Sequence, residues 1–454
     1  MMKRLLIGLI SAQFLLSACA VMVKPGAQSA TVTPAADITA TPSVATTAAP
    51  TATPTPLPPT ATPTRPPLVA VPTLSAEQLA TYTAELSATV AGLLPPSPTP
   101  DAAGYAGPTF EGVTLWPLST THTAPLWVAY STGIRDFVSN INHFIALYTL
   151  EANGWRQLLK FDLLNADYMN PDSVQQVAID PTHIWLAVNS GAGAHSGCID
   201  LYAIDAAFGP PLNAVAHCSD HPGGGEVRDL NSDGQLDVIL DQTDSYVFCY
   251  ACGVRYFIFS VLNWDGAQFV EQTLTPLPES APADLRQAVN RAVELANGGL
   301  WQAAQAQIEQ SGAAQAADPI ARWNAALINL HAQAWRDQVF NQPYPLLDNL
   351  FYGDYAATLN VMRPYPPDQL FSLTGPLIKG TVAETWESTL AFWVAKATDG
   401  ALKAQPDLAA AYFLRGWAAY LVDKRSPAAL ADIEKAAALD PNEKLFSDSV
   451  EFLK

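Results

Sequence analysis

The apolar pattern of this chain changes its period part-way along, and this change constrains the fold more than any other feature. Between about residues 108 and 276, short runs rich in Val, Ile, Tyr, Phe and Trp are separated by Gly, Asn and Asp clusters, which is typical of β-strands joined by turns. After Pro282 the sequence is rich in alanine, and apolar residues recur every three to four positions, as on one face of an α-helix. We therefore predict an all-β antiparallel domain over residues 108–280 and an all-α domain over residues 281–454.

Three stretches of the β region align with one another as internal repeats. They pair residues 126–129 with 146–148, 184–187 with 200–202, and 236–239 with 258–260. Their first strands recur after 58 and 53 residues (185 minus 127, 238 minus 185), in the range of blade-like repeats. Each unit is expected to run strand, polar loop, strand, tight turn, strand, with Asn153-Gly154 and Asp265-Gly266 as hairpin turns in matching places. Three units are fewer than the four blades of a usual closed propeller, so an incomplete propeller and a compact sandwich both remain open.

Thr, Pro and Ala dominate from about residue 23 to 74, where too few apolar side chains remain to offset the entropy of ordering. We predict a disordered tether over residues 19–107 that contains one short helix, residues 75–94. Its apolar stripe consists of Leu79, Tyr82, Leu86, Val90 and Leu93. The helix is expected either to self-associate or, as we favour, to pack on the next domain or fray, because one such helix alone is marginally stable.

The N-terminus has the pattern of a secretory signal. Lys3 and Arg4 precede an apolar run, and small residues lead to Cys19. With a Cys directly after the small residues, residues 1–18 resemble a bacterial lipoprotein signal peptide. The resemblance implies that Cys19 is acylated and anchors the chain to a membrane on the extracytoplasmic side of the cell envelope. The alternative is an ordinary secretory signal with an incidental Cys.

Charge and cysteine content narrow the partners and the compartment. Asp and Glu number 42 against 23 Lys and Arg, giving a formal net charge of -19, so a nucleic-acid backbone would be repelled and we expect no nucleic-acid partner. Besides Cys19, the chain has Cys198, Cys218, Cys249 and Cys252. An even number in an oxidising compartment predicts two disulfides. We favour Cys198 with Cys218 and Cys249 with Cys252, although the sequence leaves three pairings open.

The segment from Asp229 to Asp237 carries the clearest chemical motif, Asp-x-Asn-x-Asp-Gly-x-x-Asp before an apolar run. It resembles the calcium loop of FG-GAP and VCBS repeats, which implies a structural Ca²⁺ ion. By this resemblance the side-chain ligands would be Asp229, Asn231, Asp233 and Asp237, and the Gln235 carbonyl would fill position 7. Position 12 is Leu240 rather than Glu, which disfavours an EF-hand. The alternative is a polar turn that binds no ion and uses Asp and Asn for local backbone hydrogen bonds.

Two other patterns raise enzymatic alternatives. Three histidines and two cysteines crowd together, and a zinc site among them would support a zinc-dependent hydrolase. These residues are His195, Cys198, His217, Cys218 and His221. The spacing fits no common zinc motif, so we favour a disulfide with surface histidines. The pair Cys249 and Cys252 has redox-motif spacing, but it stands between β-runs and is expected to be a structural bridge.

The C-terminal part resembles a tetratricopeptide repeat. The matching positions are Tyr412, Gly416, Ala429, Ile433, Ala436 and Pro441, and the markers Pro406 and Pro441 stand 35 apart (441 minus 406). Gly416 would let two helices approach closely. An earlier unit with Gly298-Gly299 as its turn leads into a helix from Asp318. The resemblance implies a module that binds a protein or peptide partner.

The sequence thus predicts a lipid-anchored, non-enzymatic binding or scaffold protein with a calcium-stabilised β module and a tetratricopeptide-like helical module. Adhesion or glycan binding through the β domain is the alternative, and a zinc-dependent hydrolase is a further one. Tryptophans of the helical part could line a ligand surface, but at helical spacing we expect them in the core. These are Trp323, Trp335, Trp386, Trp393 and Trp417.

Overall fold

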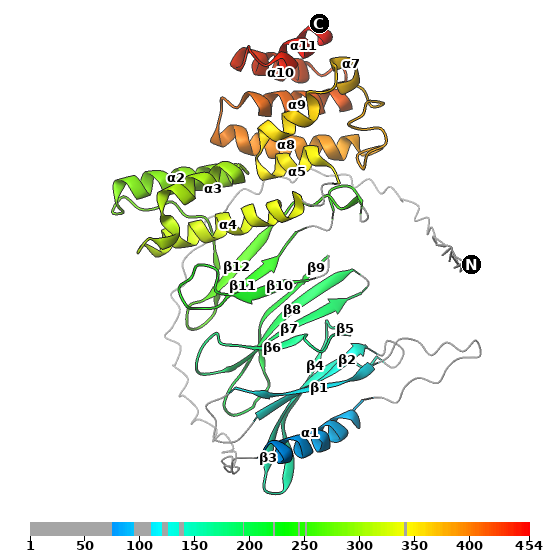
Figure 1. The fold of residues 1–454 in the computed structure, drawn as a ribbon, viewed down its shortest axis with the longest axis vertical. Coiled ribbons are helices and arrows are strands. Elements are labelled where there is room, and N and C mark those ends of the chain that lie inside the picture. Colours follow the sequence, from blue (N-terminus) through cyan, green and yellow to red (C-terminus); the bar gives the residue numbers. More distant parts are fainter. Residues whose placement is uncertain are drawn as a thin grey trace, which may run out of the picture. The chain divides into compact units, whose positions relative to one another are not determined.

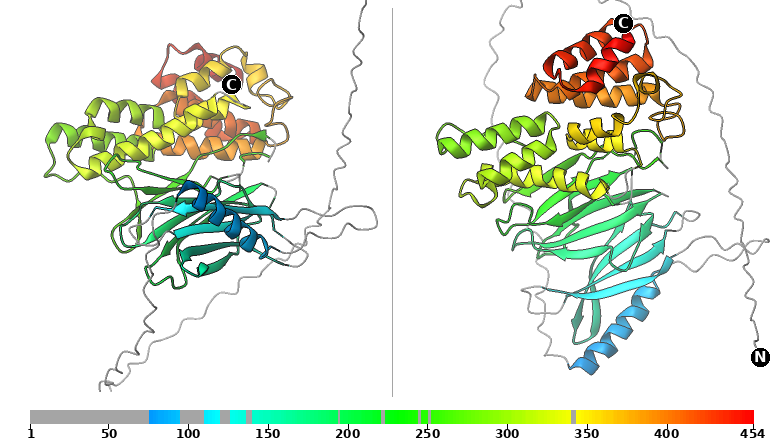
Figure 2. Two further views of the ribbon diagram at one scale, coloured as in Figure 1. Left: turned by 60° about the horizontal axis from the view of Figure 1, so that its bottom comes forward. Right: turned by 45° about the horizontal axis from the view of Figure 1, so that its top comes forward.

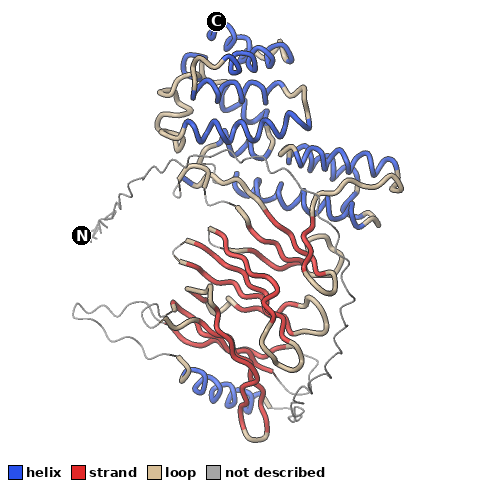
Figure 3. The backbone as a smooth tube through the Cα atoms, turned by 180° about the vertical axis from the view of Figure 1, so that it is seen from behind, coloured by secondary structure: helices blue, strands red, loops and turns tan. Residues whose placement is uncertain are grey.

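The computed structural model describes residues 75–94, 110–119, 126–135, 140–193, 195–220, 223–243, 246–249, 252–339 and 343–454. The predicted signal peptide, Cys19, His221 and most of the predicted tether lie outside these residues. Antiparallel strands lie within residues 110–272, and every regular element among the described residues after them is a helix, which confirms the predicted fold class (Figures 1 and 3).

The described residues of the β domain form three meanders of four antiparallel strands each. The first contains β1 (Phe110–Leu118), β2 (Leu126–Ile134), β3 (His143–Glu151) and β4 (Gly154–Leu163). The second contains β6 (Val174–Val177), β7 (Ile184–Ala192), β8 (Ser196–Ile204) and β9 (Leu212–Ser219). The third contains β10 (Gly225–Arg228), β11 (Asp237–Asp241), β12 (Phe259–Trp264) and β13 (Phe269–Gln272).

The three repeats expected from the sequence correspond to the second and third strands of these meanders. The expected unit was one strand too short, however, because each meander begins with a further strand. In the second and third meanders this strand has only four residues and includes polar ones, so it carries no clear period-2 signal. Strand β5 (Tyr168–Met169) pairs with β2 and β7 and thereby joins the first two meanders into one sheet, while the third forms a sheet of its own.

The predicted hairpin turns connect the third and fourth strands of their meanders. Gly154 is the first residue of β4 and has φ 105°, and Gly266 lies between β12 and β13 with φ 102°. These left-handed conformations are accessible to glycine at little cost. Asp265 also accepts hydrogen bonds from the backbone N–H groups of Ala267 and Gln268, at 2.8 and 2.9 Å. Local sequence therefore determines these two turns.

The third sheet buries both of its faces, because side chains along a strand alternate between them. Val238 and Leu240 pack in one cluster with Trp185 of the second meander. Between them along the strand, Ile239 belongs to a different cluster, together with Leu330 of helix α4 (Pro319–Val339). The third sheet therefore contacts the second meander on one face and α4 on the other.

Helix α1 (Ala76–Ala91) packs on the first meander, as the favoured interpretation of the tether helix predicted (Figure 2). Leu86 and Val90 are fully buried against a cluster that includes Trp127. The indole Nε1–H of Trp155 donates to the Tyr82 carbonyl at 3.0 Å. The β domain thus supplies the apolar surface that an isolated helix of this length lacks.

Helices occupy the remainder of the chain. Besides α4 they are α2 (Ala283–Asn297), α3 (Trp301–Ser311), α5 (Pro345–Tyr352), α6 (Tyr355–Met362), α7 (Pro367–Leu370), α8 (Glu387–Ala404), α9 (Ala409–Val422), α10 (Pro427–Leu439) and α11 (Lys444–Leu453). The prolines that interrupt the helical pattern between residues 335 and 380 include Pro345 and Pro367. Each begins a short helix, at the position where the missing N–H costs nothing.

Glycines allow close helix contacts where the repeat pattern predicted them. A Cβ atom added at Gly416 of α9 would lie 2.7 Å from the Ala429 carbonyl oxygen and 2.8 Å from Ile433 Cγ1, both on α10. The predicted turn at Gly298-Gly299 connects α2 to α3, and Gly299 has φ 74°. The chain therefore forms the expected helix pairs at both places.

The connection between β11 and β12 enters the core of the helical domain. Val247, Phe248, Cys252 and Val254 belong to the same apolar cluster as side chains of α2 to α11. Farther along this connection, the ring centroid of Tyr256 lies 5.1 Å from that of Phe351 and 5.1 Å from that of Trp393. The two domains consequently share a core, although their strands and helices are separate in the sequence.

Candidate functional site

The calcium-type loop joins β10 to β11. Its conformation is stabilised by hydrogen bonds from backbone N–H groups to side-chain oxygens of the same loop. Both carboxylate oxygens of Asp229 accept backbone N–H groups, from Asp233 at 3.2 Å and from Gly234 at 2.9 Å. The Asn231 amide oxygen accepts the Asp233 N–H at 3.0 Å, and Asp233 accepts the Gln235 N–H at 2.9 Å. Gly234 has φ 90°, which permits the tight turn expected there.

Asp237, at the end of this loop, is fully buried at the start of β11. Its carboxylate accepts the Leu230 N–H at 2.9 Å and the Asn263 amide at 2.8 Å. Burial raises the pKa of the Asp237 carboxyl, and the charges of Asp233 and Asp229 raise it further, while the two hydrogen bonds oppose the rise. Three carboxylates are thus near enough to interact, and a cation between them would relieve their repulsion.

The oxygen atoms of this loop are ligands that Ca²⁺ prefers. Each carboxylate oxygen that accepts one hydrogen bond retains a second lone pair that could bind the ion. The side chains are turned toward backbone N–H groups, however. Within the described residues, no group of three or more His, Cys, Asp or Glu side chains is arranged to hold a metal ion. The loop therefore has suitable oxygen atoms, and calcium binding stays a prediction.

The two disulfides have the favoured pairing, Cys198 with Cys218 and Cys249 with Cys252. The first links residues that face each other on β8 and β9. The second lies in the connection between β11 and β12, at the edge of the helical core. Such bonds persist in oxidising environments, which indicates an extracellular or otherwise oxidising compartment.

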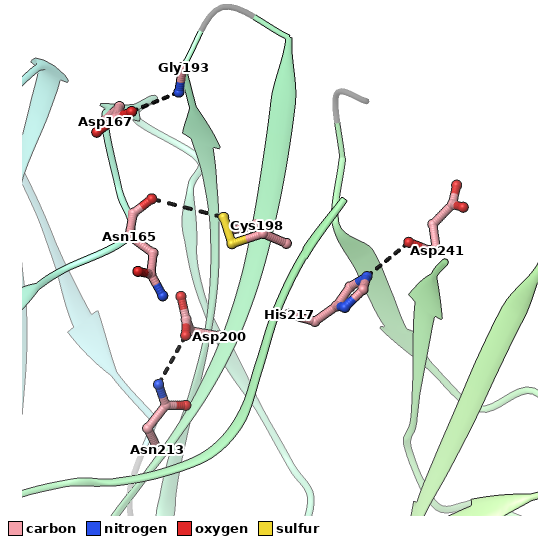
Figure 4. The surroundings of a disulfide bond; sticks show 9 residues. Asn165, Asp167, Gly193, Cys198, Asp200, Asn213, His217 and Asp241 are labelled. Atoms are coloured by element: carbon pink, nitrogen blue, oxygen red, sulfur yellow. Dashed lines mark hydrogen bonds between the residues drawn. A yellow bond between two sulfur atoms is a disulfide. The ribbon is translucent and has the colours of Figure 1, made fainter. Parts of the chain in front are cut away.

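His217, next to the first disulfide on β9, forms a hydrogen bond from Nε2 to the Asp241 carbonyl oxygen at 2.8 Å (Figure 4). The two cysteine sulfurs are bonded to each other and therefore provide no thiolate ligand. His195 stands at the turn between β7 and β8. The disulfide that the sequence favoured over a zinc site is therefore formed.

The second meander has a small polar cluster at the turn that corresponds to the calcium-type loop. Asp180 accepts the Thr182 hydroxyl at 2.6 Å, and both groups contact the same ring nitrogen of His183, Nδ1, at 3.0 and 2.9 Å. A catalytic relay needs the two partners on different ring nitrogens. Asp180 also accepts the Trp185 indole N–H at 2.8 Å, so we interpret the cluster as a structural turn.

A cavity adjoining the calcium-type loop lies between this loop and helices α3 and α4. Its volume is about 780 Å³, and we call it the junction groove. Its charged lining residues are Arg228, Glu309, Arg322 and Arg336. Its amide side chains are Asn231, Gln305, Gln315, Asn329 and Gln333. The remaining lining residues are Leu230, Ser232, Ala314, Ala316, Ala326 and Leu330.

A second cavity, of about 440 Å³, shares Arg228, Leu330 and Gln333 with the junction groove. It is lined in part by the stacked rings of Phe257 and Phe259. The two cavities abut along α4, so polar and aromatic surfaces are continuous there. This surface was missed by sequence reasoning, because its residues come from β10, the following loop, α3 and α4 and share no motif.

No protein-family model, curated protein or solved structure matches the chain significantly. None of the helices in the described part of the chain has the length and apolar character of a membrane span.

The prediction that the five tryptophans of the helical part lie in the core is confirmed for only two of them. Trp335 and Trp417 are buried, whereas Trp386 is 39% exposed and Trp323 and Trp393 are half-buried. The candidate binding site is therefore identified from the geometry of the junction groove and not from these tryptophans.

Proposed function

We propose that this chain is a lipid-anchored extracytoplasmic binding protein that holds a segment of a protein or peptide partner in the junction groove. The observation that carries the proposal is the groove itself, a concave site built from both domains and lined by amide and guanidinium groups. Binding sites for ligands are usually concave and occur preferentially between domains. Side-chain amides offer a donor and an acceptor together, as the peptide backbone does.

The N-terminal sequence and the disulfides both support a location outside the cytoplasm. We propose Cys19 as the lipid anchor because residues 1–18 resemble a lipoprotein signal peptide. The two disulfides agree with a compartment outside the cytoplasm. The Thr/Pro/Ala-rich segment would then separate the folded part from the lipid surface. A binding site at the end of a long tether can search for partners near the membrane.

The groove is tested by filling it at an exposed position. Ala314 lines the groove and is exposed, so Ala314→Trp should narrow the cavity without disturbing the core. We expect decapeptides selected from a random displayed library against the full-length protein to lose at least tenfold in affinity for this variant, measured by fluorescence polarisation. Ala303→Trp, at an exposed position of α3 outside the groove lining, is the matched control. Equal binding to both variants and the parent protein would contradict the proposed site.

We also propose that Ca²⁺ stabilises the β10–β11 loop through Asp229, Asn231, Asp233, Asp237 and the Gln235 carbonyl. In calorimetric titration of the full-length protein we expect one site with a Kd on the order of 10⁻⁴ to 10⁻³ M, as in extracellular modules. Asp233→Ala should abolish it. Asp265→Ala, which removes the carboxylate of the β12–β13 turn instead, should not.

Thermal unfolding provides a second measurement of calcium binding. For the expected range of Kd, 10 mM CaCl₂ is a tenfold to hundredfold excess and stabilises the folded state by about 1.4 to 2.7 kcal/mol, so it should raise the Tm of the parent protein but not that of Asp233→Ala. An unchanged Tm together with no heat of binding would leave the loop as a polar turn closed by its own hydrogen bonds.

A further inference from the structure

The structure carries one inference that rests on the proposed binding function and specifies its ligand. We infer that the junction groove recognises an extended, acidic peptide segment whose carboxylates pair with the arginines of α4, with Arg322 as the principal anchor. The charges of the groove, the state of the Arg322 guanidinium and the dimensions of the α4 face lead to this inference.

The lining of the groove carries a net positive charge, whereas the whole chain carries a net negative charge. Asp and Glu outnumber Lys and Arg by 42 to 23 in the whole sequence, yet the groove lining has three arginines and one carboxylate, Glu309. Arg228 is already paired, with its Nε 2.7 Å from a carboxylate oxygen of Glu226. The other two arginines, both on α4, therefore supply the positive charge available to a ligand. Anionic groups are the complement of such a surface.

Arg322 has unused hydrogen-bonding capacity. Its Nε is buried and finds no hydrogen-bond partner among the described residues, while one terminal nitrogen makes a long hydrogen bond of 3.4 Å to the Ala316 carbonyl. A buried donor without a partner costs free energy, and a guanidinium binds a carboxylate through two parallel hydrogen bonds. Because the Nε is buried, a ligand carboxylate would pair with the terminal nitrogens of Arg322, one of which makes the long bond to Ala316.

The face of α4 that lines the groove is long and regular. Arg322, Ala326, Asn329, Gln333 and Arg336 follow at spacings of four and three residues and therefore share one face of the helix. The two arginines stand at the ends of this stripe, 14 positions apart (336 minus 322), or roughly 21 Å at 1.5 Å per residue. An extended peptide covers this length with about six residues.

The small and polar side chains between the arginines favour a peptide over a carboxylated glycan. Asn329 and Gln333 can pair with the N–H and C=O groups of an extended backbone in exchange for their present hydrogen bonds. The Asn329 amide oxygen accepts from Gln305 at 3.2 Å, and Gln333 donates to Asp337 at 2.6 Å and accepts from Arg336 at 2.8 Å. The groove lining contains no aromatic ring on which a sugar could stack, whereas the adjoining cavity has Phe257 and Phe259 at its surface for an apolar side chain. We therefore expect the bound peptide to place acidic residues over α4 and an apolar residue in the adjoining cavity, beyond Gln333.

The experiment compares charge variants of the peptides and of the full-length protein. Peptides whose binding is lost in Ala314→Trp are selected first, and each is then remade with Gln and Asn in place of Glu and Asp. We expect the selected peptides to be enriched in acidic residues and to lose at least tenfold in affinity on this neutralisation. Arg322→Gln should cause a similar loss and Arg336→Gln a smaller one, while Arg425→Gln, an exposed arginine outside the groove lining, should have no effect.

Two further measurements separate charge recognition from misfolding. Arg322→Lys retains the charge without the planar guanidinium, so its affinity should lie between those of the parent protein and Arg322→Gln. Raising NaCl from 0.05 to 0.5 M should weaken the acidic peptides and leave the neutralised ones unchanged.

The outcomes distinguish this inference from the proposed function. Peptides that are blocked by Ala314→Trp but insensitive to their own charge and to Arg322→Gln would overturn the acidic specificity and leave the binding groove intact. Absence of any peptide sensitive to Ala314→Trp would overturn both. Binding of polygalacturonate that is lost in Arg322→Gln, with no peptide selected, would replace the peptide by a carboxylated glycan.

Discussion

Trp417→Ala is expected to destabilise the C-terminal helices by about 5 kcal/mol. The Trp417 side chain on α9 is fully buried in the helical core, and its indole Nε1–H donates to the Leu370 carbonyl at the end of α7, at 2.8 Å. Truncating a buried Trp to Ala costs about 3 to 5 kcal/mol, and a buried carbonyl left without its donor adds about 1 to 3 kcal/mol. Chemical denaturation of the full-length protein measures the loss.

The location of the loss tests whether the helices behave as repeats. In repeat proteins each unit contacts mainly its neighbours, so destabilisation stays local. We expect hydrogen exchange in Trp417→Ala to accelerate in α8 to α11 and to remain near parental rates in the strands of the first meander. Phe392→Ala, which removes an aromatic side chain 60% exposed on α8, is the control and should cost less than about 1 kcal/mol. A uniform acceleration through both domains would contradict repeat-like behaviour.

The second large effect is a pH dependence at Asp348 on α5. This carboxyl is 3% exposed, and burial raises its pKa from 3.8 to about 7, although a hydrogen bond from the Tyr344 N–H opposes the rise. Because the folded state binds the proton more tightly than the unfolded state, stability should rise as the pH falls from about 7 toward 4. The difference of about three pKa units corresponds to at most about 4 kcal/mol.

Asp348→Asn should remove this dependence. The uncharged amide has nearly the same shape and can still accept the Tyr344 N–H, so at pH 8 the variant should be more stable than the parent protein by up to about 4 kcal/mol. At pH 4 the two should be nearly equal. Unfolding by urea at pH 4 to 8 measures the difference, with Asp407→Asn, an exposed carboxylate, as control. If the difference in unfolding free energy between Asp348→Asn and the parent protein did not change with pH, the Asp348 carboxyl would ionise in the folded state without a free-energy cost.

The sequence anticipates those features that depend on residues close together in the chain. The strand alternation and the glycines after Asn153 and Asp265 locate the paired strands and their turns, because a turn with positive φ needs glycine at that point. The close contact of Gly416 with α10 follows from the repeat pattern in the same way. The short first strands of the later meanders escape detection, because four residues carry too little period-2 signal.

The candidate site could not be found in this way. Arg228 and Arg322 line one groove although they stand 94 positions apart (322 minus 228), and no spacing rule relates a β-strand to a helix at that distance. The calcium-type loop, by contrast, is visible as a motif, yet its sequence does not reveal that Asp229 and Asp233 turn to backbone N–H groups.

The amino-acid sequence by itself therefore determines the order of an antiparallel β domain and a helical domain, two hairpin turns and a set of cysteines whose favoured pairing is the one formed. Periodicity and turn chemistry act over a few residues, which is why they can be recognised without a structure. Only the tertiary structure decides that Val247, Phe248, Cys252 and Val254 enter the helical core, that Asp348 is buried and that Arg322 faces a groove. Burial and long-range contact depend on how complete elements pack, and local sequence does not contain that information.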